Sequence, residues 1–147
     1  MTDALPEPTT NPATSPLTEA EYQTLARFRA ALRRFAQFSE QAARQAGVTP
    51  AHHQLMLAIR GWDGDGQPSI NDVADALLLR QHSASELVDR ATDAGLVQRI
   101  TDARDARRHL LALTPRGDEV LAALSQLHRD ELRRFREETI AHLLELG

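Results

Sequence analysis

The segment ITDARDARRHLLALTPRG, residues 100–117, changes character twice within a few residues. Residues 102–108 hold three arginines and two aspartates, and residues 109–113 are then mostly apolar up to Thr114-Pro115. Short apolar stretches on both sides of a charged one predict a β-hairpin with an exposed tip. A Thr-Pro pair is a typical helix start, because proline at the first helical position loses no hydrogen bond. We therefore expect strands over 96–100 and 109–113, a tip over 101–108, and a helix from residue 115.

Two short helices joined by a tight turn are predicted immediately before the hairpin. Ser69 suits the N-cap of the first helix. Gly95 suits the end of the second, with Leu96 placed for the apolar contact that accompanies a glycine cap. Such a pair, broken near residues 79–81 and polar on the outer face of its second helix, is typical of a helix-turn-helix. The expected inward positions are Val73, Ala74, Leu77 and Leu78 on the first helix and Ala84, Leu87, Val88 and Ala91 on the second.

Long amphipathic helices are predicted on both sides of this unit, over residues 18–46 and 115–147. The first begins with a capping box at Thr18–Glu21. The apolar stripes of both helices are too long for one small domain to cover, so a partner chain is the natural cover. A shorter helix over 50–60 is apolar on nearly all sides, which predicts burial. The stripes comprise Leu25, Phe28, Leu32 and Phe35, and then Val120, Leu121, Leu124, Leu127, Leu132, Phe135, Ile140, Leu143 and Leu144.

Composition sets limits on the class of protein. The 147 residues are enough for one domain with a core, and residues 1–17 form a proline-rich segment that predicts a disordered tail. The net charge of −4 is contained in residues 1–21, and all 17 basic residues are arginine. The chain has no cysteine, which excludes disulfides and thiolate metal sites. With no signal peptide or membrane span, we expect a cytoplasmic protein without a membrane partner.

Charged and polar residues on the helix-turn-helix and the hairpin predict DNA binding. An arginine-tipped hairpin fits a narrow minor groove, whose negative potential attracts arginine. Asp102 and Asp105 are expected to pair with nearby arginines and orient them, a role in geometry because exposed pairs stabilise little. The outer face of the second helix presents side chains suited to base edges and phosphates. These are Arg80, Gln81, His82, Ser83, Ser85 and Arg90, although Ser83 could simply be an N-cap and Arg90 could pair with Glu86.

In this order and spacing, the motifs resemble the MarR family of winged-helix transcription regulators over residues 18–147. The matching residues follow the pattern Asp-x-Arg-Asp-x-Arg and then Leu-x-Leu-Thr-x-x-Gly, and LVDRATDAGLVQR, residues 87–99, matches the exit of the family's recognition helix. The resemblance implies a mainly α winged helix-turn-helix fold. It also implies a homodimer with dimerisation helices over 18–46 and 115–147 and a DNA-binding lobe over 49–113. The pattern residues are Asp102, Arg104, Asp105, Arg107, Leu111, Leu113, Thr114 and Gly117.

The same resemblance implies a ligand-responsive repressor on a pseudo-palindromic site, with a small aromatic or anionic effector. It makes Arg107 the wing-tip arginine and Asp105 the acid that orients it. Arg104 and Arg108 become phosphate contacts, and Asp102 a structural residue. At position 86 the family commonly has a basic or small polar residue, whereas this chain has Glu86. The resemblance therefore does not identify which bases this helix recognises.

Other functions find little support in the sequence. No nucleophile has a base at a recognisable spacing, and we find neither a phosphate loop nor a metal-ligand set, so we expect neither an enzyme nor a cofactor. His52 and His53 diverge by about 100° on a helix and cannot share one metal ion. A partly exposed helix start is the favoured interpretation of both, with effector binding by His53 as a hypothesis. A winged-helix module that binds proteins without DNA remains the alternative function.

Overall fold

The computed structural model describes residues 15–144, which form a mainly helical chain with one antiparallel hairpin. This confirms the predicted winged helix-turn-helix. The predicted tail over 1–17 lies almost wholly outside the described residues, as do residues 145–147. The elements in chain order are α1 (Glu19–Gln45), α2 (Pro50–Arg60), α3 (Ile70–Ala76), α4 (Gln81–Asp93), β1 (Val97–Thr101), β2 (His109–Leu113) and α5 (Pro115–Leu143).

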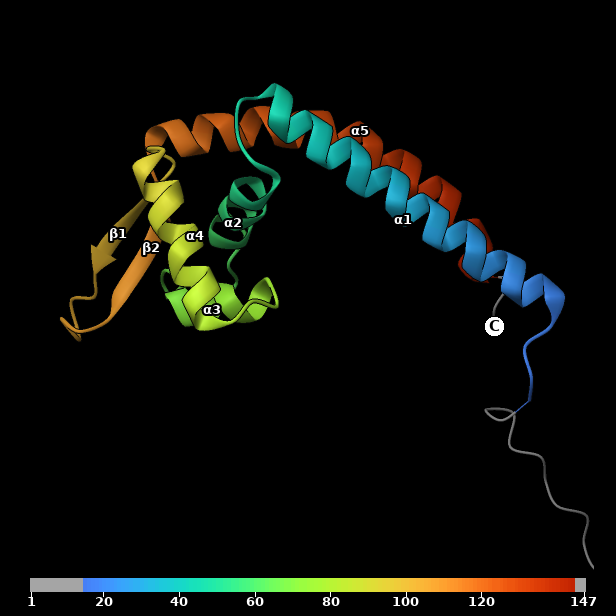
Figure 1. Ribbon diagram of the computed structural model, residues 1–147, viewed down its shortest axis with the longest axis horizontal. Helices are drawn as coiled ribbons and strands as arrows, with labels where there is room; N and C mark the ends of the chain where they lie inside the picture. The colour runs from blue at the N-terminus through green and yellow to red at the C-terminus, as the bar shows by residue number, and fades with distance from the viewer. Residues whose placement is uncertain (1–14, 145–147) are drawn as a thin grey trace, which may run out of the picture.

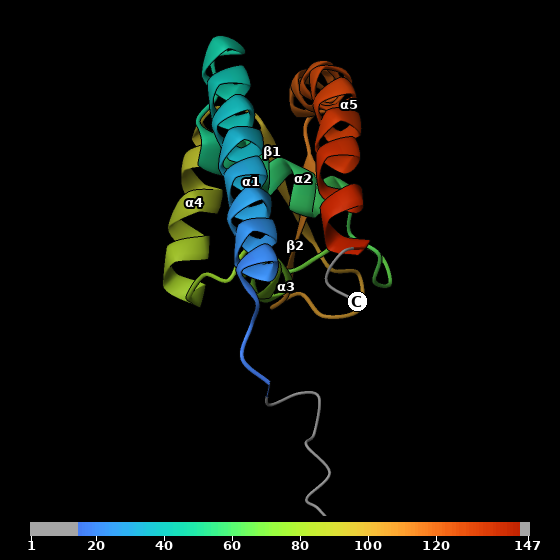
Figure 2. The ribbon, with the colours of Figure 1, turned by 90° about the vertical axis from the view of Figure 1, so that its right-hand side faces the viewer.

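The molecule consists of a lobe and an arm (Figure 1). The lobe, residues 49–113, contains α2, α3, α4 and the hairpin. The arm is formed by α1 and the part of α5 that runs beside it away from the lobe, and a view along the arm shows the two helices side by side (Figure 2). The start of α5 passes over the end of the lobe opposite the hairpin tip. No helix within residues 15–144 is long and apolar enough to cross a membrane.

Four helices begin where the sequence predicts, because a hydroxyl side chain caps each of them. Thr18 and Ser69 form capping boxes with Glu21 and Asp72, in which each side chain bonds the other residue's backbone N–H. Thr49 and Thr114 accept hydrogen bonds from the first turns of α2 and α5, each followed by proline at the first helical position.

The apolar core lies in the lobe and at its junction with α1 and α5. Its largest fully buried side chains come from α2, α3, α4, β1, β2 and α5 and from the residue just before β1: Leu55, Met56, Val73, Val88, Leu96, Val97, Leu111 and Leu124. Two expectations about packing are wrong. Leu57 is 48% exposed, so α2 is not buried on all sides, and Leu78 points into solvent rather than inward.

The arm packs differently from the predicted stripe. The buried positions along α1 are small or polar, Thr24, Ala31 and Ser39, which let α1 and α5 approach closely. An ion pair of 2.9 Å between Arg34 and Glu138 joins the two helices. Apart from Leu121 and Leu124 near the lobe, the large apolar side chains of the predicted stripes are left half-buried or exposed, among them Leu25, Leu127, Leu132, Ile140 and Leu143, as is Tyr22.

The hairpin is tied to the lobe along one strand. β1 and β2 pair in the register Val97↔Leu113 to Thr101↔His109. The Leu111 N–H donates to the carbonyl of Pro68 at 2.8 Å, and an isolated bridge joins Ser69 to Leu110. β1 starts one residue later than predicted, because the Leu96 N–H is used to close α4 on the carbonyl of Ala91.

Candidate functional site

The N-terminus of α4 differs from the other helix starts in having no side-chain cap. Arg80 is the N-cap residue, and its side chain makes no capping bond. Ser83 is the third residue of the helix, so the interpretation of Ser83 as an N-cap is wrong. The backbone N–H groups of the first turn are therefore open to an external acceptor, and helix N-termini suit phosphate groups.

The side chains predicted to contact DNA are exposed on this part of α4. Gln81, His82 and Ser83 are exposed to solvent, and Ser85, one turn further along, is half-buried. The His82 Nε2 lies 3.1 Å from a carboxylate oxygen of Glu86, so Glu86 pairs with His82 and not with Arg90 as the sequence had suggested. This pairing takes up part of the acidic charge of Glu86 whenever His82 is protonated.

The hairpin tip is shaped by its two aspartates through the backbone. Asp102 Oδ1 accepts the Arg104 N–H at 2.9 Å, and Asp105 Oδ1 accepts the Arg107 N–H at 3.0 Å. These are Asx turns, in which a carboxylate substitutes for a backbone acceptor. The expectation that the aspartates pair with guanidinium groups is wrong, since neither forms an ion pair within residues 15–144.

The three tip arginines differ in their partners. The Arg108 guanidinium lies 3.7 Å from Asp72 Oδ2, which links the wing to the capping box of α3. Within the described chain, the guanidinium groups of Arg104 and Arg107 have no ion pair. Two cations at the tip are therefore available to an external anion, and their backbone is fixed beneath them.

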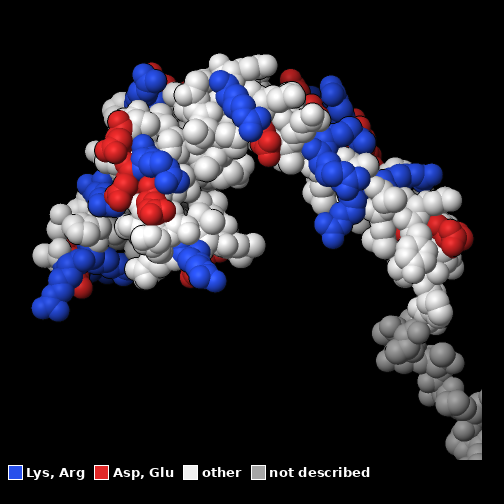
Figure 3. All heavy atoms as spheres, viewed as in Figure 1, with Lys and Arg blue, Asp and Glu red and all other residues white. Residues whose placement is uncertain are grey.

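The two parts of the candidate site lie at one end of the lobe. The first turn of α4 and the hairpin tip both lie at the end away from the start of α5 (Figure 1). In the space-filling view, blue side chains project from the hairpin tip, whereas blue and red alternate over the side of the lobe above it (Figure 3). Positive charge thus projects at this end even though residues 22–147 carry no net charge.

His53 occupies a different place from the one predicted. It is only 4% exposed, so the expectation of a partly exposed position at the start of the helix is wrong. Its ring packs against the ring of His128 of α5, with centroids 4.9 Å apart. The His128 Nδ1 lies 2.6 Å from the Leu124 carbonyl and its Nε2 2.9 Å from the Ser39 hydroxyl, whereas the buried Nδ1 of His53 has no partner.

This histidine pair was missed by the sequence analysis, because its members lie far apart in the chain. It joins α1, α2 and α5 where the lobe meets the arm. No group of three or more metal-ligating side chains occurs among residues 15–144.

The pair predicts a pH dependence of stability. Burial, and secondly the charge of His128, lower the pKa of His53 below its usual 6.5. The unfolded chain therefore binds a proton below about pH 6.5 that the folded chain resists. We expect the free energy of unfolding to decrease as the pH falls from 7 to 5, by up to about 1.4 kcal/mol per pH unit from this group. Urea unfolding at several pH values measures the decrease.

His53→Leu should remove this part of the pH dependence. His82→Gln, which removes an exposed histidine, should keep it. A His53→Leu curve parallel to that of the wild type would show that the dependence arises elsewhere.

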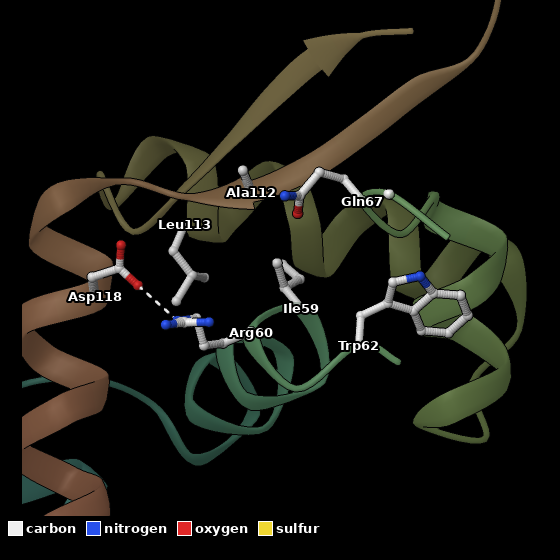
Figure 4. Close-up of a pocket in the computed structure, with 8 residues that line it drawn as sticks. Ile59, Arg60, Trp62, Gln67, Ala112, Leu113 and Asp118 are labelled. Atoms are coloured by element: carbon white, nitrogen blue, oxygen red, sulfur yellow. Dashed lines mark ion pairs between the residues drawn. The ribbon is translucent and has the colours of Figure 1, made fainter. Parts of the chain in front are cut away.

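A shallow hollow lies beside the hairpin, between α2, the loop over 62–68 and the start of α5 (Figure 4). Its volume is about 370 Å³, and Ile59, Leu113 and Trp62 are among its lining residues. The guanidinium of Arg60, at its edge, already pairs with Asp118 at 3.5 Å. The hollow is therefore separate from the first turn of α4 and offers no unpaired cation of its own.

Comparison with known proteins gives consistent matches. A family model described as the MarR family matches residues 46–108. A protein of Thauera aromatica, assigned as a transcriptional regulatory protein for the hcr operon, is 30% identical over 92 residues, which cover 63% of this chain. The matched part of the chain spans about half of that relative's length, 54%.

Solved structures share the fold over most of the chain. A MarR family transcription regulator, SP03579, is 25% identical with a TM-score of 0.68, over 85% of this chain and 81% of that one. The MepR–DNA complex of S. aureus is 22% identical with a TM-score of 0.64, over 89% of this chain and 97% of that one.

Proposed function

The chain belongs to the MarR family, and from this premise we propose that it is a sequence-specific regulator of transcription that binds double-stranded DNA. MarR-family transcription regulators are DNA-binding proteins without enzymatic activity. One observation carries the proposal. The uncapped first turn of α4 and the unpaired arginines of the hairpin tip lie at the same end of the lobe.

We assign the contacts by element. The first turn of α4 enters the major groove, where Gln81 suits adenine and the serines suit bases or phosphates. The wing places Arg107 in the adjacent minor groove, and Arg104 beside it contacts a phosphate. Arg80, Arg90 and Arg108 contact phosphates, with Arg108 also anchoring the wing through Asp72. The major-groove residues are Gln81, His82, Ser83 and Ser85, and Asp102 and Asp105 hold the tip.

We propose a homodimer formed through the arm. The support is the row of exposed large apolar side chains on α1 and α5, which a monomer would leave in water. Sedimentation velocity on the full chain should give twice the 16.3 kDa chain mass. A single species at the chain mass would contradict this assignment. Two lobes related by a twofold axis would contact two half-sites of a pseudo-palindrome.

We further propose that the protein is a repressor that releases DNA when a small aromatic or anionic effector binds. His53 is the residue proposed for this response, because it lies where the lobe meets the arm and its Nδ1 is buried without a partner. Adding candidate aromatic acids to the DNA complex, with His53→Ala as the comparison, tests this role. If the acids release DNA equally from the wild type and from His53→Ala, His53 does not take part in the effector response.

The function is tested by fluorescence anisotropy with labelled DNA from upstream of the protein's own gene and a scrambled duplex. Counterion release should weaken binding by about a thousandfold or more between 50 and 200 mM salt, for on the order of six to eight phosphate contacts in the dimer. Preference for the native fragment supports a sequence-specific regulator. Weak, equal binding to this fragment, to the scrambled duplex and to a pool of genomic fragments would favour the alternative, a winged-helix module that binds proteins.

The aspartates of the wing give a sharper prediction. Asp105→Ala removes the acceptor of the Arg107 N–H and should weaken DNA binding about fivefold, because the tip loses its fixed shape. Asp105→Asn keeps an acceptor oxygen at the same place and should bind at least as tightly as the wild type. The anisotropy assay measures both. Equal losses in the two variants would show that the negative charge, and not the Asx turn, matters.

A further inference from the structure

Leu78 has an unusual backbone conformation for a leucine. Its φ is +54°, and within residues 15–144 no other non-glycine residue has a positive φ. The Leu79 N–H bonds the carbonyl of Ala74, and the Leu78 N–H bonds that of Asp75, so Leu78 holds the left-handed position of a Schellman cap. Glycine is the usual residue there, because a Cβ atom makes this conformation unfavourable.

The packing of Leu78 gives no compensation for this conformation. Its side chain is 92% exposed, the highest value among the exposed large apolar residues of the described chain. A leucine here therefore lowers the stability of the free protein relative to a residue suited to the turn. Strained positions that packing does not explain are often retained for function.

The location of Leu78 indicates what it would meet. It lies between α3 and α4, two residues before the N-cap Arg80, and this connection is at the same end of the lobe as the hairpin tip (Figures 1 and 2). Its neighbour Leu79 is 37% exposed, and the neighbours on α4, Gln81, His82 and Ser83, are polar. The exposed apolar patch is therefore limited to Leu78 and part of Leu79, whereas a protein-binding surface needs a wider apolar centre. A small apolar patch in a polar surface fits a DNA groove better.

We propose that Leu78 contacts the C5-methyl group of a thymine at the edge of the major groove and so determines the base accepted there. This inference rests on the proposed DNA binding. The thymine methyl is the apolar group by which the major groove distinguishes this base, and an apolar side chain is its natural partner. Leu78 is thus a specificity-determining residue that acts through shape and apolar contact, beside the hydrogen-bonding residues of α4.

The test combines a change in the protein with a change in the DNA. A duplex is first selected from a randomised pool by the full-length wild-type chain, and each thymine is then replaced in turn by deoxyuridine, which lacks only the methyl. For the wild type, deoxyuridine should weaken binding only at one symmetric pair of thymines, with about a fourfold loss of affinity for each half-site that is changed. Leu78→Gly should lose a similar amount on the original duplex and nothing more on the deoxyuridine duplex.

Stability and position are controlled separately. Leu78→Gly should unfold at the wild-type temperature or above it, because glycine suits the turn. Leu57→Gln, at an exposed leucine of α2, should keep the wild-type response to deoxyuridine. If no deoxyuridine substitution weakens wild-type binding, or if Leu78→Gly still responds to it, the inference is overturned. Failure to select any duplex would instead overturn the proposed DNA binding, and the inference with it.

Discussion

Replacement of Gly117 by alanine is expected to lower the free energy of unfolding by about 3 kcal/mol or more. A Cβ atom at this buried position would lie 2.1 Å from the carbonyl oxygen of Leu96. That oxygen belongs to the backbone and accepts the Thr114 N–H at 3.1 Å, so no flexible side chain can move aside. The substitution must displace the start of α5 from the end of α4, and overpacking of this kind is among the most destabilising single changes.

Chemical denaturation of Gly117→Ala and of Gly66→Ala measures this effect against a matched control. Gly66 has a φ of +65° but open space where its Cβ would be, so alanine there meets backbone strain alone. We expect a loss of about 1 kcal/mol at Gly66. Equal losses at the two positions would show that the approach to Leu96 does not limit residue 117.

Arg107→Ala is expected to weaken binding to the selected or native DNA about a hundredfold. A groove-bound arginine contributes about 1–2 kcal/mol, and a dimer presents two wings. Because Arg107 has no ion pair within the described residues, its removal should leave the thermal unfolding midpoint and the dimer unchanged. Anisotropy titrations and sedimentation on the same protein measure the two properties.

Arg116→Ala is the matched control for charge. Arg116 is exposed in the first turn of α5, at the end of the lobe opposite the hairpin tip. Loss of the same charge there should change affinity less than threefold, because screening limits interactions beyond about 8–10 Å at physiological salt. If Arg107→Ala binds as well as Arg116→Ala, the wing does not make the proposed contact.

The local features of the fold followed from the sequence because they depend on neighbours in the chain. Helix starts at Thr18, Thr49, Ser69 and Thr114 need only a hydroxyl two or three residues from the N–H groups that it caps. The hairpin was predicted within one residue of its observed bounds, since alternation and flanking turn residues are local signals too. The motif Leu-x-Leu-Thr-x-x-Gly was recognised, but the reason for its glycine was not.

Contacts between distant segments were decided only by the tertiary structure. Gly117 must lack a side chain because Leu96, 21 residues earlier, turns its carbonyl toward it. His53 is buried where His128 of α5, itself hydrogen-bonded to Ser39 of α1, packs against its ring, and the sequence of α2 alone gives no sign of these partners. The aspartates of the tip act on backbone N–H groups rather than on arginine side chains, a choice set by the geometry of the turn.

The sequence by itself thus determined where helices and strands begin and which face of the lobe carries arginine and polar side chains. The apolar spacing predicted that the Leu78 side chain points into the core, because the spacing continues as if the helix did. The backbone leaves the helix at Leu78, where φ is positive, and its side chain points into solvent instead. Only the folded chain shows which apolar side chains remain exposed to solvent. Burial is a sum over all elements that approach a residue, and those elements come from every part of the sequence.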